Sequence, residues 1–145
     1  KNLGKKAYRF IFVIDIRRQL YCLLNQGIVR GATQRLVKLE LQQQPHDELI
    51  AYIDAIIYDL KNTDGKYGLE KIPNVDYQQQ FSALNTLWHR VKSNIYAVRQ
   101  NPANSPLLLQ SSEVHFEIAK NTVFAADNYT TSNSHQLTLL SAVML

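Results

Sequence analysis

Apolar side chains recur every three or four residues between Tyr77 and Val98. They are Tyr77, Phe81, Leu84, Trp88, Val91, Ile95 and Val98. Because an α-helix has about 3.6 residues per turn, this spacing places all of them on one helical face. Asp76 and Gln79 match the N-cap and N3 positions of a capping box at its start. The pattern predicts an amphipathic helix with one face in a core.

Three further segments show helical spacing. Residues 1–44 contain no proline and carry leucine and isoleucine at helical intervals, and residues 47–60 form a broad apolar face that ends at the turn-rich NTDGKYG. Ser105-Pro106 suits the start of a last helix that reaches about Tyr129. Since mostly short connections make successive helices antiparallel, we expect an all-α, up-down-up-down four-helix bundle.

The chain of 145 residues fits one domain, 1–145. An up-down-up-down bundle has both chain ends at the same end. The chain lacks an initiator methionine, and its closing LTLLSAVML is similar to the beginning of an apolar run. We therefore expect the first and last helices to lead to membrane helices in a parent protein, with residues 1–18 and 136–145 close to the membrane.

Sequence motifs for catalysis and cofactor binding are absent. There is no Gly-rich phosphate loop, Gly-x-Ser-x-Gly elbow, Cys-x-x-Cys-His or paired Glu-x-x-His motif, and the four histidines are widely separated. Cys22 is interpreted as a packing residue. The net charge of +4 comes from basic residues crowded into the first eighteen positions, which disfavours a nucleic-acid-binding surface. We expect no enzyme activity, cofactor, metal or nucleic-acid partner.

The string GIVRGATQR, residues 27–35, places glycine and arginine inside the first helix. Glycine there costs about 1 kcal/mol relative to alanine. With Ile28 directed at the core, Arg30 faces away from the bundle and shares its face with Gly27, Gly31 and Gln34. The pair of small residues would allow a second helix or a ligand to approach the backbone. We expect a partner subunit on this face.

Arg35 has a different predicted orientation. It lies within about 20° of Ile28 around the helix, so it is expected to point inward. A buried arginine requires a carboxylate. The candidates at matching levels of the bundle are Asp54, Asp59, Glu113 and Glu117.

The segment Gly27-x-x-Arg30-x-x-x-Gln34-Arg35 resembles the first-helix signature of the sensor domains of nitrate-sensing histidine kinases and type IV pili methyl-accepting chemotaxis transducers. Together with DELIAYIDAIIYDL, DGKYGL and TVFAADNY, it is similar to extracytoplasmic sensor regions of clostridial-type transmembrane receptors. The resemblance implies that Arg30 binds an anion between the first helices of two protomers, with Gly27 at the close approach. Gly31 and Ala32 replace bulkier residues of the nitrate pattern.

These features predict an extracytoplasmic ligand-sensing domain at the cell membrane. It binds a small anion, nitrate-like or carboxylate, through Arg30, Gly27, Gly31 and Gln34 at a homodimer interface, and transmits a helix displacement. The output domain of the parent receptor could be a histidine kinase, a chemotaxis signaller or a diguanylate cyclase. The alternative is a cytosolic helical adaptor that binds a protein partner through the Gly27/Gly31 face.

Overall fold

The chain is all-helical over the residues whose backbone the computed structural model describes, 2–61 and 74–144. Side chains are described for residues 4–7, 25–61, 74–129 and 131–132. The elements are α1 (Asn2–Leu41), α2 (Asp47–Lys61), α3 (Val75–Gln100), the short 3-10 helix η1 (Pro102–Asn104) and α4 (Ser105–Met144). These ranges include no β-strand, and the all-helical prediction is confirmed.

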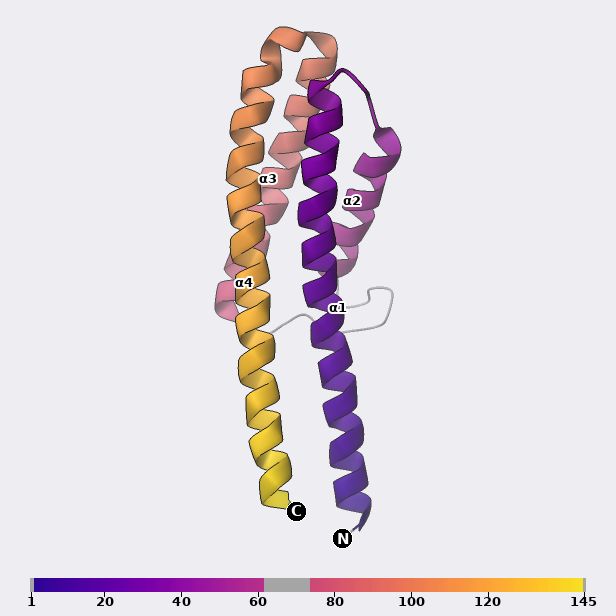
Figure 1. The fold of residues 1–145 in the computed structure, drawn as a ribbon, viewed down its shortest axis with the longest axis vertical. Coiled ribbons are helices and arrows are strands. Elements are labelled where there is room, and N and C mark those ends of the chain that lie inside the picture. The colour runs from indigo at the N-terminus through magenta and orange to yellow at the C-terminus, as the bar shows by residue number, and fades with distance from the viewer. Residues whose placement is uncertain (1, 62–73, 145) are drawn as a thin grey trace.

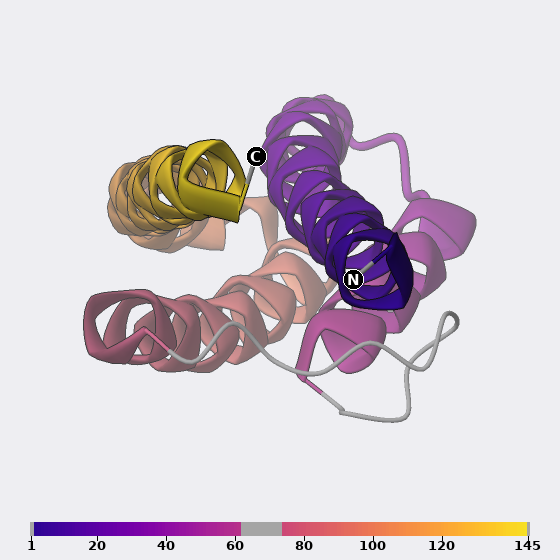
Figure 2. The ribbon, with the colours of Figure 1, turned by 90° about the horizontal axis from the view of Figure 1, so that it is seen from below.

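Successive α-helices run in alternating directions (Figure 1). The two longest helices, α1 and α4 with 40 residues each, lie side by side and extend beyond α2 and α3, so both chain ends lie at the same end of the molecule. Viewed from that end, α2 and α3 both lie on one side of the α1–α4 pair (Figure 2). The most extensive packing is between α3 and α4, while α1 contacts each of the other three α-helices.

The core is formed by the apolar faces of all four α-helices. Every member of the Tyr77–Val98 stripe is buried, as predicted. Trp88, the largest fully buried side chain, has its indole N–H satisfied because it donates to Asp54 Oδ1 over 2.7 Å. Lys92 Nζ lies 2.8 Å from the same carboxylate oxygen and 5.5 Å from the centre of the Trp88 ring. These contacts join α2 to α3.

Two helix ends differ from the sequence prediction. Asn74, instead of Asp76, is the N-cap of α3, and its side-chain oxygen accepts a hydrogen bond from the Tyr77 N–H over 2.9 Å. Asn and Asp are comparable N-caps, so residue type could not distinguish them. At the other end of the chain, α4 continues past Tyr129 to Met144. The polar run after Tyr129 lacks the proline or glycine that would favour a stop there.

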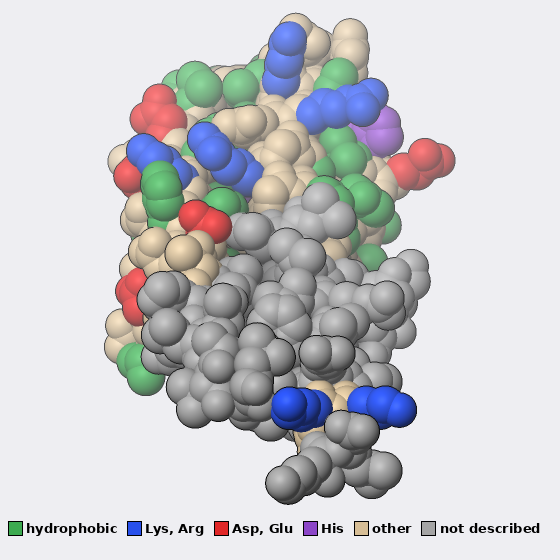
Figure 3. All heavy atoms as spheres, turned by 60° about the horizontal axis from the view of Figure 1, so that its bottom comes forward, with side chains coloured by type: hydrophobic (Ala, Val, Ile, Leu, Met, Phe, Trp, Pro, Cys, Tyr) green, Lys and Arg blue, Asp and Glu red, His purple; other side chains and the backbone are tan. Residues whose placement is uncertain are grey.

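The ends of α1 and α4 are where membrane-proximal segments were predicted. Within the described residues, no helix combines the length and apolarity needed to cross a bilayer. Of the basic residues clustered near the N-terminus, Lys5 and Lys6 have described side chains, and Figure 3 shows basic side chains at this end of the molecule. The side chains of residues 8–24 and 133–145, including Cys22, lie outside the described set.

Candidate functional site

The candidate site is a solvent-facing strip of α1. Gly27, Arg30, Gly31 and Gln34 are all exposed. On a helix these four positions lie within about 100° of one another, so they form one continuous surface, here named the Gly27 face. The prediction that Arg30 points away from its own bundle is confirmed.

Both glycines of the Gly27 face border open space. A Cβ atom built at Gly27 or Gly31 would meet no heavy atom within 4 Å. Packing inside this protomer therefore does not require glycine at either position. Alanine would favour the helix by about 1 kcal/mol, so intramolecular folding gives no reason for the two glycines. Close approach of a second molecule to the backbone would provide one.

The predicted inward orientation of Arg35 is wrong, because its side chain is exposed. The error comes from the choice of Ile28 as the centre of the core face. Ile28 is only half-buried. The fully buried positions of this part of α1 are Val29, Thr33 and Leu36, and they face roughly 100° away from Ile28.

The expected carboxylate partners of Arg35 have other surroundings. Asp54 pairs with Lys92, Asp59 is half-buried, and Glu113 and Glu117 are exposed. Within the described part of the chain, Arg35 forms no ion pair with any of them.

A partly buried ion pair does exist, between Glu40 on α1 and Arg99 on α3. Arg99 Nε lies 2.8 Å from Glu40 Oε1, and Arg99 Nη1 lies 2.7 Å from Asp47 Oδ1 at the start of α2. The Glu40 side chain is 1% exposed. The hydrogen bond to Glu40 is the main cause that raises the pKa of Arg99. This three-residue cluster links α1, α2 and α3. Glu40 continues the spacing of Val29, Thr33 and Leu36, so the sequence could have shown that Glu40 lies on the core face, without identifying Arg99 as its partner.

Behind the Gly27 face, a buried polar contact connects α1 to α3. Gln26, which is 1% exposed, donates from Nε2 to the Tyr77 hydroxyl over 2.7 Å. The Tyr77 ring is stacked on Phe81, with 6.0 Å between ring centres and 13° between ring planes. The residue next to Gly27 in sequence is therefore fixed to the neighbouring helix.

His115 on α4 is a second buried polar group that sequence reasoning missed. It is fully buried, 6.3 Å from the Trp88 ring and 6.0 Å from the Phe116 ring between centres. Neither ring nitrogen has a hydrogen-bond partner in the described part of the protein. Burial lowers the pKa of His115 to about 4. The described side chains include no group of three or more His, Cys, Asp or Glu that could hold a metal ion.

The arrangement on α1 offers a guanidinium and an accessible helix backbone, without a nucleophile or an acid–base pair on the same face. Such a surface can bind an anion or a second helix. The chain matches no protein-family model, no curated protein and no solved structure.

Proposed function

We propose that this chain is the extracytoplasmic ligand-sensing domain of a bacterial transmembrane signalling receptor. In this proposal the helices form an up-down-up-down four-helix bundle that pairs with a second copy through α1. A small anion, nitrate-like or carboxylate, binds at that interface. The observation that carries the proposal is the Gly27 face, where two glycines border open space beside the exposed Arg30.

The charge of Arg30 explains why an anion belongs in the interface. If α1 meets the same face of a second protomer across a two-fold axis, the two Arg30 side chains converge. Like charges repel when water is partly excluded, and an anion between them removes that repulsion. The planar guanidinium fits flat and tetrahedral oxyanions and remains charged at any physiological pH. Gln34 on the same face adds an amide donor.

The lengths of α1 and α4 supply a route for the signal. Forty helical residues span about 60 Å, and both helices extend past α2 and α3 toward the end where the chain begins and finishes (Figure 1). In the parent receptor these ends continue into membrane helices. A displacement of α1 by about 1–2 Å on anion binding, as is common for helices at subunit interfaces, would be transmitted along the same helix.

Calorimetric titration of the 145-residue chain with nitrate, nitrite, sulfate and acetate tests the proposal. We expect at least one of these anions to bind the parent protein, and Arg30→Ala to weaken that binding by about tenfold or more, because it removes a charge-assisted hydrogen bond. Arg90→Ala is the matched control, since Arg90 is an exposed arginine on α3. An anion that binds the parent and Arg30→Ala equally well contradicts the proposed site.

The alternative proposal is a cytosolic helical adaptor, in which the Gly27 face binds a protein and Arg30 meets an acidic side chain. The same open face supports it. The two proposals differ in the ligand. An adaptor would show no saturable binding of the small anions, and Arg30→Ala would weaken only the protein–protein contact.

A further inference from the structure

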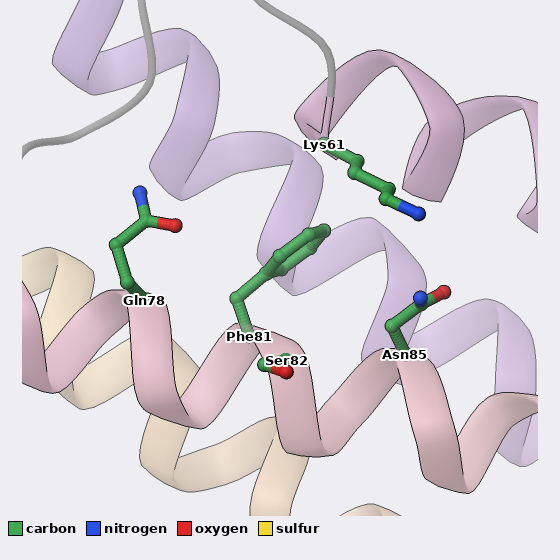
Figure 4. A pocket seen from close by; sticks show the side chains of 5 residues that line it. All are labelled: Lys61, Gln78, Phe81, Ser82 and Asn85. Carbon is green, nitrogen blue, oxygen red and sulfur yellow. The ribbon is translucent and has the colours of Figure 1, made fainter.

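A concave site that shares no residue with the Gly27 face lies between the end of α2 and the first half of α3. It has a volume of about 250 Å³, and the described residues that line it are Lys61, Gln78, Phe81, Ser82 and Asn85. Figure 4 shows Phe81 at its centre, with Lys61 reaching in from α2, Asn85 on the same side and Gln78 on the other side of the ring.

The described lining combines one positive charge with neutral polar groups. Lys61 contributes an ammonium, Gln78 and Asn85 contribute amides, and Ser82 contributes a hydroxyl. The described lining contains no carboxylate. The side chains of Lys61, Ser82 and Asn85 have no hydrogen-bond or ion-pair partner among the described residues. Free donors around an ammonium favour an anionic oxygen group as the occupant.

Phe81 gives the site a fixed apolar floor. The residue is 6% exposed, so a small part of it faces the cavity. Its ring is stacked on Tyr77, and the Tyr77 hydroxyl is held by Gln26. A floor that is already fixed by packing needs little reorganisation when a flat ligand binds.

The volume is sufficient for a small ligand. An apolar cavity of about 150 Å³ is sufficient to hold benzene, whereas pockets for drug-sized ligands begin at about 300 Å³. From this size, the donor groups and the aromatic floor, we propose that the α2–α3 site binds a small organic monocarboxylate with a flat apolar body. The carboxylate meets Lys61 and Asn85, and the apolar body lies against Phe81.

The site is independent of the proposed function on α1, so the test must separate the two. Benzoate is the probe, and the readouts are its dissociation constant by calorimetry and the shifts of the Ser82 and Asn85 amide signals in ¹H–¹⁵N spectra. Benzyl alcohol keeps the ring without the charge, and acetate keeps the charge without the ring. Both should shift the Ser82 and Asn85 signals only at higher concentrations than benzoate does, and this readout separates the α2–α3 site from any acetate bound at Arg30.

Lys61→Gln should weaken benzoate binding by about tenfold, because it removes a charge-assisted hydrogen bond. Lys120→Gln on α4, an exposed lysine outside the site, should leave binding unchanged. Arg30→Ala should also leave it unchanged. The proposal is overturned if Lys61→Gln binds benzoate as well as the parent, if the Ser82 and Asn85 signals do not move, or if Arg30→Ala abolishes binding.

Discussion

At the residue scale, the turn that follows α1 contains a backbone conformation that costs stability. Gln43 has a φ of 60°, in the left-handed region. The Gln44 N–H donates to the Leu39 carbonyl and the Gln43 N–H to the Glu40 carbonyl, over 2.9 and 3.1 Å. This pair of bonds is the Schellman arrangement, which usually has glycine at the left-handed position. A glutamine there carries a penalty that glycine would not.

We therefore expect Gln43→Gly to raise the free energy of unfolding by about 0.5–1 kcal/mol. Urea denaturation measures the change. Gln42→Gly, one position earlier, is the control and should not stabilise the protein, because Gln42 is not among the described residues with a positive φ. Equal or lower stability of Gln43→Gly would show that the strain is compensated elsewhere.

The Glu40–Arg99 pair sets the second expectation at this scale. Arg99→Met leaves the Glu40 carboxylate buried without its partner, and breaking a buried pair in this way costs about 3–5 kcal/mol. Arg35→Met removes an exposed arginine and should change stability by about 0.5 kcal/mol or less. Denaturant unfolding of both variants compares them directly. Similar losses in the two would contradict the assignment of Arg35 to the surface and Arg99 to the buried pair.

At the scale of the elements, hydrophobic periodicity predicted where the helices lie in the sequence better than it predicted which face of each helix is buried. The α3 stripe was identified residue by residue because an apolar side chain recurs at every third or fourth position, which defines a single helical face. In α1 the core face includes Gln26, Thr33 and Glu40, which are polar. Hydrogen bonds satisfy these polar groups in the core. The Thr33 hydroxyl donates to the Val29 carbonyl over 2.7 Å, and Gln26 and Glu40 each form a hydrogen bond with a residue of α3. Because the prediction used apolar residues alone, it centred the core face of α1 on Ile28. This choice placed Arg35 on the buried side of the helix.

The exposed part of the candidate site was easier to predict than the buried polar contacts. Gly27 and Arg30 lie far around the helix from any choice of core face, so a moderate rotation left them outside. Glu40–Arg99 and Gln26–Tyr77 join residues more than fifty positions apart. Pairing over such separations depends on how the helices pack, which local spacing does not encode.

Packing of α4 against α3 makes stability depend on pH through His115. The ordinary histidine pKa is 6.5, and burial lowers that of His115 to about 4. Above pH 6.5 His115 binds no proton in either the folded or the unfolded state, so it does not lower the free energy of unfolding. Between pH 6.5 and 4 only the unfolded state binds it. The free energy of unfolding should then fall by about 1.4 kcal/mol per pH unit as pH decreases.

Chemical denaturation at several pH values measures this slope. His115→Gln, which does not titrate, should lose less stability than the parent between pH 6.5 and 4, by about 3 kcal/mol in total. His89→Gln is the control, because His89 is an exposed histidine on α3 and its removal should leave the slope unchanged. A parallel pH dependence in His115→Gln and the parent would mean that His115 gains a partner on protonation.

At the scale of the whole molecule, the proposed function depends on assembly. The Gly27 face alone is open to solvent, and one exposed guanidinium binds anions weakly in water. Two copies would enclose the anion between two charges and exclude water, which strengthens each contact. By linkage, an anion that binds the dimer better than the monomer must strengthen dimerisation by the same factor.

Sedimentation equilibrium of the 145-residue chain, with and without the tightest-binding anion from the calorimetric series, measures this coupling. We expect the anion to lower the dimer dissociation constant of the parent by about tenfold, within the usual range of coupling energies. Gly27→Leu should prevent dimerisation because its side chain fills the space for a second helix, and Arg30→Ala should dimerise without any response to the anion. An anion that binds the parent while its dimer dissociation constant stays unchanged would contradict an interfacial site.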